Sequence, residues 1–89
     1  MTTFAICISE FLNCKDDNIL DKLFELTEVN VLDPNDLDPD YNHFAFDNVC
    51  GMPYNLRLTS KKSLDYHKPG WLDIDYESFC IVLKDYHAN

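Results

Sequence analysis

Residues 33–42 divide the chain into two parts that must fold differently. The segment reads Asp-Pro-Asn-Asp-Leu-Asp-Pro-Asp-Tyr-Asn, and its two prolines and four aspartates end any helix or strand that reaches it. Before this segment the clearest apolar pattern has the helical period, and after it the period shifts towards the alternation of strands. With 89 residues in total, we expect a single domain, residues 1–89, that combines both kinds of element.

Residues 17–28 give the clearest helical pattern. Neither Gly nor Pro interrupts them, and Asp16 or Asp17 can cap the first turn. The apolar face is formed by Ile19, Leu20, Leu23, Phe24 and Thr27. The outer face carries Asp21, Lys22, Glu25 and Glu28. We predict a helix that lays its apolar face on the core.

Two further segments fit more than one structure. Residues 4–12 form a helical stripe, but the apolar run 4–8 also fits a buried strand, and we favour the helix. Residues 78–86 suit a strand by their β-branched content. A helical stripe with polar residues at both ends is also present there: Asp75, Tyr76, Phe79, Cys80, Leu83, Lys84 and His87. For this second segment both alternatives stay open.

The part of the chain after the break predicts a hairpin. Its apolar side chains alternate with smaller or polar ones, and they are Phe44, Phe46, Tyr54, Leu56 and Leu58. Gly51-Met52-Pro53 marks the turn, and we expect the apolar face to lie on the helices. Residues 61–68 are polar and end at a Pro69-Gly70 turn, and residues 71–74 predict another strand. The expected fold class is α+β, with an antiparallel sheet of three or more strands packed against one or two helices.

The cysteines indicate the compartment. Cys7, Cys50 and Cys80 have apolar neighbours, and free cysteine packs like a small hydrophobic residue. No secretion signal opens the chain, because Met1-Thr2-Thr3 leads into Phe4 without a base. We expect a cytoplasmic protein in which these three and Cys14 are buried, reduced thiols. Two disulfides or metal ligation are the alternatives.

The Asp-rich segment partly matches a calcium-binding loop. Asp36, Asp38 and Asp40 fall at positions 1, 3 and 5 of such a loop, and Asp47 falls at position 12. Position 6 needs Gly for its sharp turn, and Tyr41 stands there instead. We therefore expect a solvated loop in which the aspartates bond their own backbone, with a cation site as the alternative.

No sequence motif points to catalysis. The histidines are scattered without metal-ligand spacing, at His43, His67 and His87. Two glycines leave no room for a glycine-rich phosphate-binding or dinucleotide-binding loop, and no nucleophile motif is present. We expect a protein that is not an enzyme and that has no cofactor.

Charge is the most informative feature for function. Sixteen Asp and Glu against seven Lys and Arg give a net charge of −9. This charge opposes direct binding to DNA, RNA or an anionic membrane, and no apolar run approaches the roughly 20 residues of a membrane span. No base lies between Lys22 and Arg57, whereas four of the seven bases lie in 57–68. The sequence predicts a long acidic flank and a small basic segment.

Carboxylates spread over a rigid surface can imitate the phosphates of a nucleic acid. We therefore expect the acids to bind a basic protein, such as a nuclease or a nucleic-acid-binding complex, with aromatic side chains as anchors. The expected partner-binding residues are Glu25, Glu28, Asp33, Asp36, Asp38, Asp40, Tyr41, Asp47, Asp73 and Asp75. Among the aromatics, Phe44 and Trp71 are expected in the core and Tyr41 and Tyr66 at the surface.

In size and charge the chain resembles small acidic inhibitors made by phages and bacteria. These include anti-CRISPR and other DNA-mimic proteins, and immunity proteins that block toxin nucleases. The resemblance implies a non-catalytic inhibitor, covers both of these types, and transfers no role to any single residue. The alternatives are a salt-insensitive interaction module or subunit of a larger assembly, and a metal-binding regulatory protein that uses the Asp-rich loop.

Overall fold

The molecule is built on a four-stranded sheet with the strand order β3-β2-β1-β4. The computed structural model describes residues 1–86, and the strands are β1 (Thr2–Cys7), β2 (His43–Val49), β3 (Met52–Thr59) and β4 (Leu72–Asp73). β1 and β3 pair antiparallel with β2, and the short β4 pairs parallel with β1. The predicted α+β class is confirmed, whereas the parallel pair departs from the antiparallel sheet expected.

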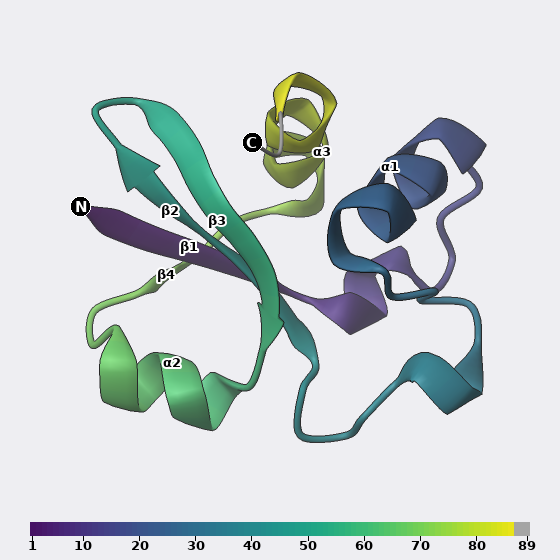
Figure 1. The fold of residues 1–89 in the computed structure, drawn as a ribbon, viewed down its shortest axis with the longest axis horizontal. Coiled ribbons are helices and arrows are strands. Elements are labelled where there is room, and N and C mark those ends of the chain that lie inside the picture. Colours follow the sequence, from purple (N-terminus) through teal and green to yellow (C-terminus); the bar gives the residue numbers. More distant parts are fainter. Residues whose placement is uncertain (87–89) are drawn as a thin grey trace.

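Three α-helices are present in residues 1–86: α1 (Asp17–Thr27), α2 (Lys61–His67) and α3 (Tyr76–Asp85). Short 3₁₀ helices, η1 (Ile8–Phe11) and η2 (Pro34–Asp36), occur in the connections. α1 and α3 lie on one face of the sheet, and α2 lies on the other (Figure 1). The sheet is therefore covered on both sides, with one helix more than expected. None of the helices described is long and apolar enough to cross a membrane.

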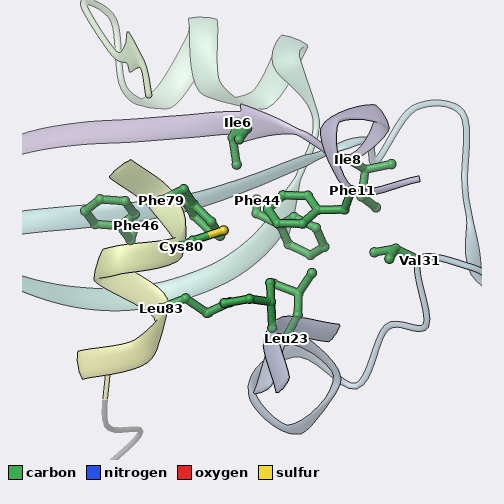
Figure 2. Packing of buried hydrophobic residues seen from close by; sticks show 11 residues of the cluster. Ile6, Ile8, Phe11, Leu23, Val31, Phe44, Phe46, Phe79, Cys80 and Leu83 are labelled. Atoms are coloured by element: carbon green, nitrogen blue, oxygen red, sulfur yellow. The ribbon is translucent and has the colours of Figure 1, made fainter. Parts of the chain in front are cut away.

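Alternation along the strands gives the two faces of the sheet different side chains. On one face, Ile6 of β1 stands opposite Phe44 of β2, and both belong to the main core beneath α1 and α3 (Figure 2). On the other face, Ala5 stands opposite Ala45, and both cluster with Leu64 of α2. The face towards α1 and α3 therefore holds most of the hydrophobic core.

The main core joins η1, α1 and α3 to the sheet (Figure 2). The ring centroid of Phe11 lies 5.8 Å from that of Phe44 and 5.6 Å from that of Phe79, in edge-to-face contacts. Leu23 of α1 and Leu83 of α3 are also buried in this cluster. These contacts fix the inner face of α1, so that its opposite face is turned to solvent.

The expectation of a helix over residues 4–12 is wrong, because residues 2–7 form β1 and residues 8–11 form η1. β1 pairs with β2 along its whole length. Its two faces are covered by the main core and by α2, so the strand has a continuous apolar run instead of an alternation. Periodicity cannot separate such a run from a helix, and the backbone pairing with β2 decides for the strand.

The expected hairpin is confirmed, with a shift in the turn. Its apolar face is confirmed for Phe44, Phe46, Leu56 and Leu58. Tyr54 was wrongly placed on that face, because a register shift between β2 and β3 sets it opposite Asp47, where it is 54% exposed. The turn is formed by Cys50 and Gly51, whose φ angles are 54° and 81°, a combination that suits the twist of two-residue hairpins. Met52 and Pro53 begin β3 and do not belong to the turn. β3 is an edge strand, where proline is tolerated because it lacks a backbone N–H to donate. The predicted strand within 71–74 is also confirmed, as β4.

α2 and α3 differ in how well the sequence predicts them. The sequence predicts only a polar segment at the position of α2, because Leu64 is its one buried residue and no apolar period results. Ser60 caps it by accepting a hydrogen bond from the N–H of Ser63 (3.0 Å). For 78–86 the helical alternative is confirmed, and Asp75 caps α3 as that alternative expects. His87, named with the same stripe, lies outside the described residues.

The four cysteines are free, as expected, but they are not all buried. Cys80 is buried, Cys7 and Cys14 are half-buried, and Cys50 is exposed. Burial was therefore wrongly expected for Cys50, because its position in the two-residue hairpin turn leaves nothing to cover it.

Candidate functional site

The outer side of α1 carries a row of carboxylates. Ile19 and Leu23 are buried in the core, which turns the opposite side of the helix to solvent. Residues three or four positions apart lie on one side of a helix. That side bears four exposed acids, Asp17, Asp21, Glu25 and the C-cap residue Glu28, which together we call the acidic face. The preceding residue, Asp16, fixes the start of the helix by accepting from the N–H of Asn18 (3.0 Å).

The chain reverses direction after α1 and is held beside it. Glu28 has a φ of 60°, which ends the helix in the left-handed region. The N–H of Asn30 donates to Oδ2 of Asp36 (3.2 Å), and the N–H of Leu32 donates to Oδ1 of Asn30 (3.0 Å). Val31 is buried in the main core. The loop is therefore anchored by a buried side chain and by its own hydrogen bonds.

The Asp-rich segment consists of Asx turns, as expected. Oδ1 of Asp33 accepts from the N–H of Asn35 (2.9 Å), and Oδ1 of Asp38 accepts from the N–H of Asp40 (2.9 Å). In the described part of the chain, no group of three or more His, Cys, Asp or Glu is placed to hold a metal ion. The aspartates therefore stabilise the loop through local hydrogen bonds.

Most of the negative charge of the protein lies in α1 and this loop. Nine of the sixteen acids fall in residues 16–40, against Lys22 as the one base. The ion pairs found among residues 1–86 are Arg57–Asp47 and Lys61–Asp65, so none involves these nine acids. With the half-buried Asp33 as the exception, they are all exposed. Their combined field therefore reaches solvent without being neutralised by an ion pair among residues 1–86.

An apolar groove opens next to the acidic face. It has a volume of about 500 Å³, and its apolar lining consists of Leu20, Phe24, Val31 and Leu32. Asp17 and Asp21 line it as well, so carboxylates border an apolar floor. Phe24 is 52% exposed and Leu32 is 53% exposed, although both are large and apolar.

The sequence wrongly placed Phe24 on the face that lies on the core. Ile19 and Leu23 are at the centre of that face, whereas Leu20 and Phe24 lie one position further round the helix. The helical period predicts the helix correctly but makes its buried face too wide. The sequence contains one weak indication that Phe24 is exposed, because its position on the helix adjoins those of the acidic residues Asp17 and Glu28.

Asp47 was expected among the partner-binding residues, but it is buried and does not belong to the exposed acidic surface. It stands opposite Thr3, on the side of the sheet that faces α2, and it is 6% exposed. Its Oδ1 accepts from Oγ1 of Thr3 (2.8 Å) and lies 3.4 Å from Nη1 of Arg57. Burial favours the neutral carboxyl, but the hydrogen bond from Thr3 and the charge of Arg57 outweigh burial and lower the pKa of Asp47. Asp47 is therefore part of the interior.

Asp73 and Asp75 are exposed but belong to other elements than the acidic face. Asp73 in β4 pairs with Ala5, whose side chain faces α2, so Asp73 lies on the opposite side of the sheet from α1. Asp75 caps α3 by accepting from the N–H of Ser78 (3.4 Å), and hydrogen bonding to Ser78, chiefly to its side chain, lowers the pKa of Asp75. The structure thus groups seven of the ten expected residues in α1 and the following loop: Glu25, Glu28, Asp33, Asp36, Asp38, Asp40 and Tyr41.

The far end of the loop lies near the basic segment. Asp40 and Tyr41 line a hollow of about 470 Å³ together with Lys61 and Lys62 of α2. These lysines reduce the negative field at this end of the loop. The acidic field is therefore strongest at α1 and the turn after it.

The aromatic residues divide as expected. Phe44 is fully buried, and Trp71 is half-buried against the small cluster under α2, where its Nε1 donates to Asp65 (2.7 Å). Tyr41 and Tyr66 are 51% and 79% exposed. Of these two, only Tyr41 lies in the loop that follows α1, next to Asp40.

Comparison with known proteins finds no relative. No family model matches the chain, and searches of curated proteins and of solved structures find no match.

Proposed function

We propose that this protein is a non-catalytic inhibitor that binds the nucleic-acid-binding surface of a basic protein, such as a nuclease. The acidic face of α1 and the loop of residues 28–41 form the proposed interface. One observation carries the proposal: nine of sixteen acids lie in residues 16–40, all but Asp33 are exposed, and neither ion pair found among residues 1–86 involves them.

The physical basis is competition for one positive surface. A site that binds the phosphates of a nucleic acid attracts a dense row of carboxylates in the same way, while the nucleic acid itself is repelled by this protein. Steering by such a field raises association rates by about 10- to 1000-fold and weakens strongly with salt. An anti-CRISPR type of inhibitor and a toxin-immunity protein would both use this mechanism.

Rigidity supports the same proposal. α1 is fixed to the core through Leu23, and the loop is anchored by Val31 and by the hydrogen bond from Asn30 to Asp36. Carboxylates held at fixed positions lose little conformational entropy when a partner binds. A disordered acidic tail would lack this advantage.

The test is capture of the partner from a lysate of the organism that carries the gene, or of its host, with three forms of the full chain. One form is unchanged, and one has Asp21→Asn, Glu25→Gln and Glu28→Gln in the acidic face. The matched control has Asp73→Asn, Glu77→Gln and Asp85→Asn, which are exposed acids outside the acidic face and remove the same charge.

We expect the unchanged chain and the control to retain a basic nuclease or nucleic-acid-binding protein, which added nucleic acid or high salt releases. The acidic-face variant should retain much less, and the captured enzyme should be inhibited by the unchanged chain. Equal capture by all three forms, or a partner indifferent to salt and nucleic acid, would contradict the proposal. The second result would favour a salt-insensitive interaction module.

A further inference from the structure

We infer that the groove between α1 and residues 30–32 receives an apolar side chain of the partner that is flanked by Lys or Arg. The inference rests on the proposed function, because it names the segment of the basic partner that the acidic face would hold. The groove adds a specific apolar contact to the charged interface.

The groove leaves large apolar side chains open to water. About half of the surface of Phe24 and of Leu32 is exposed, and Leu20 and Val31 complete the apolar lining. Single exposed apolar residues are common on protein surfaces, but these two line one concave site of about 500 Å³. A pocket of this kind is where binding energy concentrates when an apolar anchor enters it.

The groove is formed before any partner binds. Val31 is 3% exposed and belongs to the main core, so it fixes one wall of the groove. The hydrogen bonds from Asn30 to Asp36 and from Leu32 to Asn30 hold the loop that carries the wall. A preformed groove avoids the ordering cost that a flexible loop would add on binding.

Charge decides which occupant the groove fits. Asp17 and Asp21 line it beside the apolar residues, and Glu25 and Glu28 continue the same acidic face. Bases on both sides of the inserted side chain would meet these carboxylates, whereas an acidic segment would be repelled. A second copy of this chain is disfavoured for the same reason, because each copy carries a net charge of −9.

The test uses two synthetic peptides of equal charge, Lys-Arg-Leu-Arg-Lys and Lys-Arg-Ser-Arg-Lys, titrated into the isotope-labelled full chain and followed by NMR. We expect the leucine peptide to shift the amide signals of residues 20–24 and 31–32 and to bind about tenfold more tightly than the serine peptide. Phe24→Ser should abolish this preference. Ile81→Ser removes an apolar residue of α3 that is 64% exposed, and it should leave the preference unchanged.

Three results would overturn the inference. They are equal binding of the two peptides, a leucine preference that survives Phe24→Ser, and shifts of the groove signals with protein concentration alone, which would indicate a second copy in the groove.

A failure of the proposed function gives a different set of results. In that case the leucine preference is present, but the captured partner is indifferent to salt and to the acidic-face substitutions. If those substitutions release the partner while Phe24→Ser leaves its dissociation rate unchanged, the proposed function stands and the groove inference fails.

Discussion

The two sides of the sheet use carboxylates in opposite ways. On the side of α1, the interior is apolar and the acids stand outside, where neither ion pair found in residues 1–86 involves them. On the side of α2, the interior contains polar groups, because Asp47 is buried with Thr3 and pairs with the half-buried Arg57. His43 is buried on the same side, and burial lowers its pKa. The same side-chain type is thus a structural group on one side and a candidate binding group on the other.

This difference shows how far a net charge can guide a functional argument. Sixteen acids give the protein its charge, but Asp47 and Asp65 are paired with bases and do not form an open acidic surface. The acids of α1 and its loop have no such partners among the described residues. A carboxylate is a candidate for partner binding when it is exposed, unpaired and held on a rigid element, and these conditions meet on the α1 side.

The largest expected effect tests the apolar interior of the α1 side. Leu23 is fully buried, and its neighbour Phe24 is 52% exposed. We expect Leu23→Ala to lower the free energy of unfolding by about 2–5 kcal/mol, through lost burial and a residual cavity. Phe24→Ala, the matched control, should cost clearly less, as measured by urea unfolding. Equal losses would mean that Phe24 supports the core and that the groove is not an open site.

A smaller effect is expected on the α2 side. Asp47→Asn keeps the shape of the side chain but removes its negative charge. The carboxylate that faces Arg57 and accepts a hydrogen bond from Thr3 is thereby replaced by a neutral amide. We expect a loss of about 1–3 kcal/mol in the free energy of unfolding, because hydrogen bonds to a charged group are replaced by weaker ones. Asp36→Asn in the loop should leave the urea midpoint unchanged, since an amide oxygen can still accept from the N–H of Asn30. If Asp47→Asn and Asp36→Asn change the free energy of unfolding equally, Asp47 has no greater structural role than the exposed acids, and the contrast between the two sides of the sheet is wrong.

The smallest effect is a difference in pH dependence. The pKa of Asp47 is lower in the folded protein than the value of about 3.9 for an unfolded chain, so its ionised form favours folding. This contribution is fully present well above that value, and it is lost as the pH falls through the folded pKa. The stability difference between the unchanged protein and Asp47→Asn should therefore be constant from about pH 7 to pH 5 and shrink below pH 4.

Urea unfolding of both proteins across this range measures that difference. The titration of His43 is common to the two proteins and largely cancels from it. A stability difference that grows as the pH falls would contradict the lowered pKa of Asp47.

Much of the local structure could be predicted from the sequence because its causes are local. Helix α1 follows from its apolar period, from the absence of Gly and Pro, and from Asp16 as a cap, which the structure confirms through the N–H of Asn18. The hairpin follows from the alternation around Gly51. The concentration of acids before Arg57 is a property of the sequence itself.

Tertiary structure alone decided the remainder, because it depends on contacts between residues far apart in the chain. The run 4–8 is ambiguous until β2 supplies backbone partners for β1. α2 buries one side chain, Leu64, whose alanine neighbours come from two distant strands. Asp47 is interior because of its register opposite Thr3, and Phe24 lines an open groove because Val31, and not Phe24, fills the core beside α1. Local sequence sets which element a segment can form, and distant partners set which of its faces is buried.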